Sequence, residues 1–227
     1  MTEVSLHKPS EFGREEWLDL QTLYRDALFS TIDRSLAEID ALAGMDEPRR
    51  YFTSHGDPNT EVGPGRRYLP DQSYTKPRVA IATDAGEVVG FMYAADNVSW
   101  SIRNKLHLPT SVLGIDLTAI DRHEEKRKLE GTTKRYLWLR EVAVRQDHQR
   151  QGLLRDLGRV ILASADEDQP VSTYLWPDEI PFLQSVAEAA GFVPTGNRSV
   201  SIFGEGSPNT SQVRMQAPSV RTVNDRL

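Results

Sequence analysis

One unit constrains the fold of this chain more than any other: an apolar strand, a polar turn and an amphipathic helix in direct succession. Residues 136–144 (YLWLREVAV) combine β-branched, aromatic and leucine side chains, a composition typical of a strand buried within a sheet. The turn 145–152 (RQDHQRQG) contains no apolar side chain and ends at a glycine. The helix predicted for 153–165 carries its apolar residues on one face: Leu153, Leu154, Leu157, Val160 and Ile161. This succession predicts an α/β protein whose central strand leads directly into a helix.

Apolar runs on both sides of this unit predict further strands and helices. Residues 78–83 and 88–95 flank an Asp-x-Gly turn, a pattern that favours a hairpin. Apolar residues recur at every third or fourth position over 14–43, which predicts a long amphipathic helix or a bent pair of helices. After the central unit we expect a strand at 171–176, a helix over 177–191 with Gly191 as its cap, and a closing hairpin of 199–204 with 213–216.

The length of 227 residues suits one domain with additions better than two full domains. We expect a single domain over 1–216 with insertions at about 45–77 and 96–135. The first insertion holds five prolines and three glycines and is predicted to be irregular, whereas the polar and charged second insertion is predicted to form a surface helix. Residues 217–227 are predicted to be a flexible C-terminal tail.

Composition excludes several kinds of site. The chain has no cysteine, which removes disulfides, thiolate metal sites and thiol nucleophiles. Its five histidines show no H-x-x-x-H or H-E-x-x-H spacing, so we expect no metal site. No apolar stretch approaches the roughly 20 residues that cross a bilayer, and the N-terminal segment lacks the charge pattern of a leader. We therefore expect a cytoplasmic protein with no membrane partner.

Charge is distributed unevenly along the chain. The net charge of −6 argues against nucleic acid as a partner. Residues 134–159 nevertheless carry seven basic and three acidic side chains, so the rest of the chain is strongly acidic. A basic segment in an acidic chain favours one anionic ligand at one place, although a solvated helix face would have the same composition.

The turn that ends at Gly152 has the properties of an anion-binding site. The first turn of a helix leaves about four backbone N–H groups unpaired and carries a partial positive charge. Gly152 has no Cβ, so its backbone can approach a bulky phosphate group closely. Arg150 and Arg155 would add full charges beside these dipoles. The segment matches neither a Walker loop nor G-x-G-x-x-G, and a plain glycine at a helix start remains the alternative.

This turn resembles the signature of the GCN5-related N-acetyltransferase (GNAT) superfamily, Arg/Gln-x-x-Gly-x-Gly/Ala. Gln149 and Gly152 fit the signature, whereas Leu154 departs from its final small residue. Three further segments resemble the family in the expected order: GEVVGF (86–91), LREVAV (139–144) and AGF (190–192). The resemblance covers about residues 78–204 together with the N-terminal helical region. It implies a GNAT-like fold, in which helices flank both faces of a mixed, mostly antiparallel, twisted sheet.

The resemblance also implies acetyl-CoA as cosubstrate. In this family the central strand and the next strand separate, and the pantetheine arm binds to backbone in the gap. Val142, Ala143 and Val144 would then line the pantetheine arm. The residues implied at the diphosphate are Gln149, Arg150, Gln151, Gly152, Leu153, Leu154 and Arg155.

Acetyl transfer to an amine needs a base, because an alkylammonium with a pKa near 10.4 is protonated at neutral pH. Glu141 is the candidate, since related proteins often place a carboxylate at this point of the central strand. An ion pair with Arg140 or Arg145, or an outward and solvated carboxylate, is the alternative reading of Glu141.

The general acid that is usual in the family is missing. Its tyrosine would stand four residues before the glycine of the GF pair, where this chain has Ala187. Protonation of the departing thiolate would then fall to Tyr174, to water or to no group at all, and Tyr174 could equally be a packed strand residue. Three tryptophans could line the acceptor pocket or belong to the core: Trp100, Trp138 and Trp176.

These observations together predict an N-acetyltransferase that transfers acetyl to a primary amine by direct attack in a ternary complex. The acceptor is expected to be a small-molecule or peptide amine, and a homodimer is left open. A catalytically weak GNAT-derived module that binds acyl-CoA for regulation is the first alternative. A different phosphate-binding domain that uses the same helix start is the second.

Overall fold

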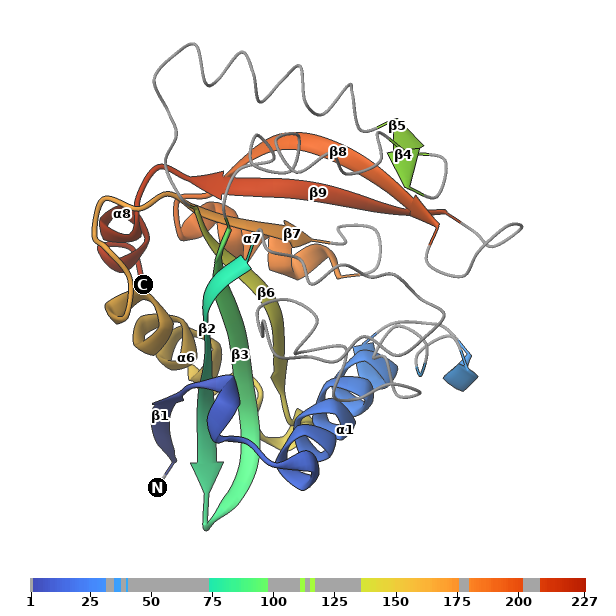
Figure 1. Cartoon of the computed structure of the whole chain (residues 1–227), viewed down its shortest axis with the longest axis vertical. Coiled ribbons are helices and arrows are strands. Elements are labelled where there is room, and N and C mark those ends of the chain that lie inside the picture. The colour runs from blue at the N-terminus through green and yellow to red at the C-terminus, as the bar shows by residue number, and fades with distance from the viewer. Residues whose placement is uncertain are drawn as a thin grey trace.

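The computed structural model describes residues 2–31, 35–37, 40, 74–97, 111–112, 115–116, 136–175, 180–201 and 209–227. The elements in chain order are β1 (Glu3–His7), a 3₁₀ turn (Pro9–Glu11), α1 (Arg14–Thr31), β2 (Tyr74–Asp84), β3 (Glu87–Asn97), β4 (Ser111–Val112), β5 (Ile115–Asp116), β6 (Tyr136–Val144), a second 3₁₀ turn (Gln146–His148), α6 (Leu153–Ala163), β7 (Val171–Leu175), α7 (Pro181–Ala189), β8 (Val193–Ser201), β9 (Asn209–Ala217) and α8 (Val220–Asn224). Figure 1 shows their arrangement.

The centre of the fold is a seven-stranded sheet with the strand order β1-β2-β3-β6-β7-β9-β8. Its neighbouring strands run antiparallel except for β6 and β7, which are parallel and are joined by a crossover through α6. β4 and β5 form a separate two-stranded sheet. The prediction of a mixed, mostly antiparallel sheet is therefore confirmed.

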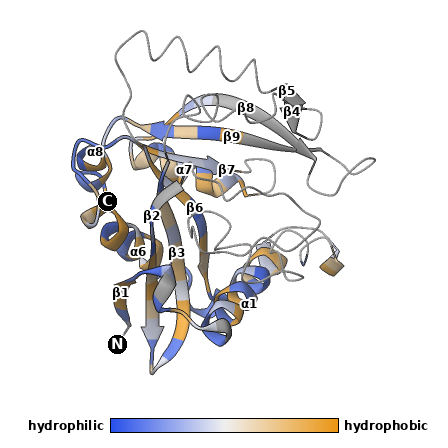
Figure 2. Ribbon diagram, in the orientation of Figure 1, coloured by the Kyte–Doolittle hydropathy of each residue, from blue (hydrophilic) through white to orange (hydrophobic). Residues whose placement is uncertain are grey.

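Helices cover both faces of the sheet because the strands alternate their side chains between two apolar clusters. One cluster joins β2, β3 and β6 to α6 and α8 through Ala82, Met92, Leu137, Leu157, Ile161 and Val223. The other joins the opposite face to α1 through Val79, Phe91, Tyr93, Trp17, Leu20 and Leu28. In Figure 2 both α1 and α6 carry apolar and polar stretches, as expected of helices with one buried side.

The β2–β3 hairpin has the tight turn that its sequence predicts. Ala85 and Gly86 have φ angles of 50° and 84°, which is the backbone of a two-residue type I′ turn. The turn closes between Asp84 and Glu87, which are paired in the register. This end of the hairpin contacts the turn that precedes α6, through Arg145 and His148.

A β-bulge interrupts β6 at Arg140. Along β3 the neighbours Tyr93 and Ala94 pair with Glu141 and Leu139, so Arg140 is the extra residue. A one-residue insertion reverses the alternation of side chains. As a result Leu139 and Val142 pack on the same cluster as α6. Glu141 therefore shares the face of Ala143, which packs on the cluster of α1.

β6 and β7 pair over three residues only, from Leu137 opposite Val171 to Leu139 opposite Thr173. Beyond Leu139 the two strands separate while β6 continues to Val144 along β3. The predicted separation of the central strand from the next strand is therefore confirmed, and Figure 1 shows the two strands diverging.

Buried polar contacts hold the C-terminal end of α6. Arg78 on β2 is 6% exposed and donates a hydrogen bond of 2.9 Å to the carbonyl oxygen of Ser164. The same guanidinium pairs with Asp96 on β3, which is 3% exposed. Both charges are therefore compensated within the protein, which a buried pair requires.

α7 ends as predicted at Gly191. Gly191 has a φ of 91°, and its N–H donates to the carbonyl of Glu188 at 3.0 Å. The N–H of Phe192 donates to the carbonyl of Ala187 at 2.9 Å. These two bonds form a Schellman motif, which needs a residue with a positive φ at this position.

The prediction of a flexible tail over 217–227 is wrong. Residues Val220–Asn224 form α8, whose first turn is capped by Ser219 through a hydrogen bond of 3.1 Å from the N–H of Thr222. Val220 and Val223 are 1% and 2% exposed in the cluster of α6. Burial of this pair at helical spacing, together with the cap, holds the segment in place.

Several predictions meet the structure only in part. α1 confirms the N-terminal helix over Arg14–Thr31, and β1 was not predicted. β2 begins at Tyr74, three residues before the first predicted insertion ends. Within the surface helix predicted over 96–135, residues 96–97 belong to β3 instead, and residues 111–112 and 115–116 form the small β4–β5 pair. Residues 45–73, 98–110 and 117–135 lie outside the described residues, as do Trp100 and Trp176.

Candidate functional site

A cavity of about 780 Å³ lies where β6 and β7 separate. Residues from both faces of the sheet line it: Tyr24 and Leu28 of α1 from one side, and Leu162 and Phe192 from the side of α6 and α7. The cavity therefore passes through the gap in the sheet. Two ligands could reach the same point on β6 from opposite faces.

Most residues expected to bind the cosubstrate line this cavity. They are Val142, Ala143, Val144, Gln149, Arg150, Gly152, Leu153, Leu154 and Arg155, joined by Glu141. Gln151 and Tyr174 are not among the lining residues.

Beyond Leu139 the β7 side of β6 presents main-chain groups to the cavity. The N–H of Arg145 donates to the carbonyl of Val89 at 2.8 Å, which fixes the phase of the antiparallel ladder with β3. Alternate residues of such a ladder exchange hydrogen bonds with the partner strand. Val142 and Val144 are out of phase with Arg145, so their N–H and C=O groups point away from β3, toward the gap.

The start of α6 has the geometry of an anion site. Gly152, the residue before the helix, has a φ of 86°, and no side chain caps the helix. The first bond of the helix runs from the N–H of Asp156 to the carbonyl of Gly152 at 3.1 Å. The N–H groups of Leu153, Leu154 and Arg155 precede that bond, so helix geometry gives them no acceptor within α6. All three residues lie at the cavity wall.

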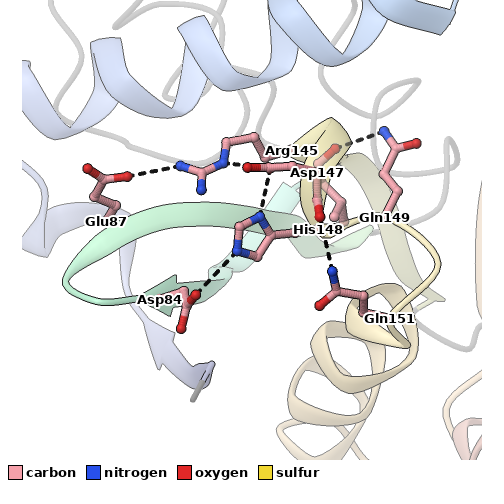
Figure 3. Close-up of polar contacts among 8 residues, drawn as sticks. Asp84, Glu87, Arg145, Asp147, His148, Gln149 and Gln151 are labelled. Carbon is pink, nitrogen blue, oxygen red and sulfur yellow. Dashed lines mark hydrogen bonds and ion pairs between the residues drawn. The ribbon is translucent and has the colours of Figure 1, made fainter.

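The glutamine side chains of the turn stabilise its backbone. Gln149 donates from Nε2 to the carbonyl oxygen of Val144 at 3.0 Å. Gln151 donates from Nε2 to the carbonyl oxygen of Asp147, also at 3.0 Å (Figure 3). The two amides thus bridge the ends of the turn between β6 and α6.

Ionic contacts join the same turn to the β2–β3 hairpin. Arg145 donates from Nε to Asp147 Oδ1 at 2.8 Å and from a terminal nitrogen to Glu87 Oε2 at 3.0 Å. His148 lies with Nδ1 2.7 Å from Asp147 Oδ1 and Nε2 3.4 Å from Asp84 Oδ2 (Figure 3). The pKa of Asp147 is lowered to about 2, by its hydrogen bond with Arg145 first and with His148 second. Its carboxylate is therefore ionised throughout the physiological pH range.

Glu141 is buried at the centre of the cavity wall. It is 5% exposed, so the solvated alternative is excluded. Its Oε1 lies 3.4 Å from a terminal nitrogen of Arg140, whereas Arg145 is engaged by Asp147 and Glu87 instead. The ion pair with Arg140, one of the alternatives for Glu141, is therefore present in the structure, and the carboxylate lies in the wall of the cavity that α1 also lines.

The α7 side of the cavity is apolar. Its lining residues from this region are Ile180, Phe182, Leu183, Val186, Ala187 and Ala190. Ala187 provides no proton donor at the position where the resemblance implies a tyrosine. Tyr174 packs its ring edge-on against Trp138 at 5.1 Å between centroids, and the guanidinium of Arg214 lies over the ring of Trp138. The structure therefore does not bring Tyr174 to the cavity, and Trp138 belongs to this packed group.

Sequence patterns did not select several polar residues of the cavity wall, and three of them lie outside β6 and β7. Tyr24 and Thr31 come from α1, and His148 from the turn before α6. The tyrosine and threonine lie in an amphipathic helix without a motif, so no local signal marks them. His148 directly precedes Gln149 and could have been selected from that position.

Within the described residues, no cluster of three or more His, Asp or Glu side chains has the arrangement of a metal site. None of the described helices is long and apolar enough to cross a membrane.

Comparison with known proteins identifies the architecture. No protein-family model and no curated protein sequence matches the chain. Among solved structures, a histone acetyltransferase HPA2-related acetyltransferase from Corynebacterium glutamicum has a TM-score of 0.50 and 13% identity, with 96% of each chain covered. The apo form of YjaB from Escherichia coli has a TM-score of 0.50 and 15% identity, with 96% of this chain and 99% of that chain covered. NAA60 from Arabidopsis thaliana, in complex with a bisubstrate analogue, has a TM-score of 0.50 and 8% identity, with 95% and 98% covered. At these identities the likeness establishes the fold.

Proposed function

Because the chain has the GNAT acetyltransferase fold, we propose that it is an acetyl-CoA-dependent N-acetyltransferase that acts on a primary amine. One observation carries the proposal. The uncapped start of α6, the free main-chain edge of β6 and the buried Glu141 all line one cavity. The start of α6 suits a diphosphate, the edge of β6 suits a pantetheine arm, and Glu141 suits a reacting amine.

The diphosphate is assigned to the turn from Gln149 to Arg155. Backbone N–H groups at a helix start, with the positive end of the helix dipole, bind anions without side-chain help. Arg150 and Arg155 are exposed beside them and add full positive charge. The left-handed backbone at Gly152 keeps the approach free of a Cβ.

The pantetheine arm is assigned to the free edge of β6. The arm contains two amides. We assign them to the N–H and C=O of Val142 and to the N–H of Val144, so that the arm pairs with β6 like an added strand. The carbonyl of Val144 already accepts from Gln149, so this group is not counted among the ligands. The apolar side chains of α7 enclose the arm from the other side.

In the proposed reaction Glu141 accepts a proton from the ammonium, directly or through one water. The neutral amine attacks the thioester carbonyl, a C–N bond forms, the C–S bond breaks and CoA leaves as thiolate. The attacking nitrogen, positively charged after the attack, releases its second proton to water and becomes the amide. The thiolate takes its proton from water, since neither Ala187 nor Tyr174 provides one. The acceptor approaches from the α1 face, where Tyr24 and Thr31 line the cavity.

A second candidate function is an acyl-CoA-binding regulatory module. The observation that favours it is Ala187 at the apolar wall, which leaves the departing thiolate without an acid. This candidate shares the cosubstrate site with the enzyme and differs in having no turnover.

Binding is tested first by calorimetric unfolding with acetyl-CoA. Ligand at 100 times its Kd stabilises the folded state by about 2.7 kcal/mol, which raises Tm by about 5–10 °C in a domain of this size. No shift at millimolar acetyl-CoA would contradict both candidate functions.

Turnover is tested by CoA release with a panel of amines. The Glu141→Gln variant is expected to lose about 10²-fold or more in kcat while it keeps its affinity for CoA. Glu15→Gln is the matched control, because Glu15 is exposed on α1 away from the cavity. Equal rates for wild type and Glu141→Gln across pH remove Glu141 as the base, and binding without release by any amine favours the regulatory module.

A further inference from the structure

The turn before α6, residues 145–152, also contacts a segment that is distant in the sequence. Arg145 reaches Glu87 and His148 reaches Asp84, both at the tip of the β2–β3 hairpin (Figure 3). The two contacts connect residues that are 58 and 64 positions apart in the chain. The hairpin therefore supports the turn through these two contacts.

His148 occupies the central position in this contact. Its side chain is 13% exposed and lies between two carboxylates, Asp147 on its own turn and Asp84 on the hairpin. It also lines the cavity next to Gln149 and Arg150. A neutral imidazole can donate from only one nitrogen, whereas an imidazolium donates from both. Only the charged ring can therefore donate to Asp147 and Asp84 at the same time.

We propose that His148 is a positioning residue for the cosubstrate diphosphate: as an imidazolium it ties the turn before α6 to Asp84 and holds the anion-binding N–H groups in place. This proposal rests on the proposed function, since it assigns that diphosphate to the start of α6. The ring acts through the backbone of the turn and adds positive charge at the cavity wall.

The surrounding charges favour the imidazolium. The pKa of His148 is raised above its ordinary 6.5, by the hydrogen bond with Asp147 first and that with Asp84 next, against burial and the charge of Arg145. Conversely the hydrogen bond with His148 is the main cause that lowers the pKa of Asp84. The pKa of Arg145 is raised by Asp147 and Glu87, so it stays charged.

These directions determine how CoA affinity should depend on pH. A raised histidine pKa means that the tie is complete below pH 6.5 and is lost as pH rises through the higher pKa of the folded state. The 3′-phosphate of CoA, a monoester with a second pKa of about 6, changes little above pH 7. In acetyl-CoA the sulfur is acylated and does not titrate, so the affinity of acetyl-CoA measured between pH 7 and 9 reports the protein, and it is expected to fall.

The test is isothermal titration of acetyl-CoA, without an acceptor amine, at pH 7 and pH 9. Loss of a charged hydrogen bond corresponds to about tenfold in Kd. We expect wild type to weaken about tenfold between the two values, and His148→Gln to bind at pH 7 as wild type does at pH 9, without further pH dependence. Asp84→Asn should weaken binding as well, and the double variant should be no weaker than His148→Gln because both act through one contact.

Two further measurements separate positioning from general damage. S-acetylpantetheine lacks the diphosphate, so the ratio of kcat/KM for acetyl-CoA to that for S-acetylpantetheine should fall about tenfold in His148→Gln. His7→Gln on β1 is the matched control, since His7 pairs in the register with Val79, away from Asp84. It should keep the wild-type ratio.

The outcomes are distinct. Wild-type affinity and pH dependence in His148→Gln overturn the inference while the proposed function stands. An unchanged ratio with both rates lowered also overturns it, because the role of His148 is then general stability. A wild-type protein that binds no CoA overturns the proposed function and this inference together.

Discussion

The two ends of the cavity are lined by different kinds of chemical group. At the α6 end, main-chain N–H groups, glutamine amides and an ionic network define a polar site whose parts hold one another by hydrogen bonds of 2.7–3.4 Å. At the α7 end the lining is aliphatic and aromatic, and Phe182 and Val186 remain 57% and 42% exposed. One end presents hydrogen-bond donors that would suit an anion, while the described lining of the other end is apolar.

This difference separates binding from chemistry. The polar end can recognise the diphosphate that every CoA thioester shares, because its donors are held in fixed positions. None of the described residues from Ile180 to Ala190 that line the apolar end could take or give a proton. The proposed reaction therefore relies on Glu141 and on the stability of the leaving thiolate, whose thiol has a pKa near 8.5.

Gly152→Ala should have the largest effect on CoA binding. Gly152 has a φ of 86°, and an added Cβ would lie 3.2 Å from a terminal nitrogen of Arg155. Strain of about 1–3 kcal/mol at this backbone corresponds to a Kd raised roughly 10- to 100-fold if the turn moves to relieve it. Titration calorimetry measures the change.

Gly191→Ala is the control at the opposite end. Gly191 has a φ of 91°, and an added Cβ would lie 3.2 Å from side-chain atoms of Arg226 and Thr222. Both variants should lose similar stability in urea, but Gly191→Ala should bind CoA within a few-fold of wild type. Equal losses of affinity would mean that the two ends do not differ as described.

Ala187→Tyr should change turnover by an intermediate amount. A phenol at the apolar wall would supply the missing acid, and kcat for CoA release should rise about three- to tenfold, less than a full general acid gives because thiolate already leaves well. Ala187→Phe has nearly the same volume without the hydroxyl. If both variants slow the enzyme equally, the side chain only crowds the cavity and the thiolate needs no acid there.

Gln149→Ala and Gln151→Ala should have the smallest effects. Gln149 lines the cavity and its amide occupies the carbonyl of Val144, so its loss should raise the Kd for CoA about threefold, the value of one neutral hydrogen bond. Gln151 does not line the cavity and donates to Asp147, so its loss should stay within about twofold. The reverse order in titration would assign Gln151 a direct contact with the ligand.

The parts of the fold that could be predicted from sequence are those set by local chemistry. β6 has the bounds predicted from its apolar run, and the helix start at Leu153 follows directly from the glycine before it. The cap at Gly191 was predictable because few residues other than glycine adopt its backbone conformation. The anion site could be proposed for the same reason, since its donors belong to the backbone.

The parts that could not be predicted depend on contacts between distant segments. From sequence Tyr174 is a candidate acid, but in the structure its ring packs against Trp138 on β6 and does not line the cavity. α8 has few apolar residues, and its order comes from burial of Val220 and Val223 against α6. The role proposed for His148 depends on its contact with Asp84 on the hairpin, and no local sequence pattern predicts that contact.

The extra residue at Arg140 has a practical consequence for anyone who compares this chain with its structural neighbours. Odd-numbered and even-numbered residues of β6 exchange faces at Arg140. An ungapped alignment with a strand that lacks the bulge is therefore wrong by one residue either before or after Arg140. Such an alignment would nominate Arg140 or Val142 as the counterpart of Glu141. Superposed coordinates, with a gap opened at the extra residue, are therefore the safer guide for choosing substitutions in this strand.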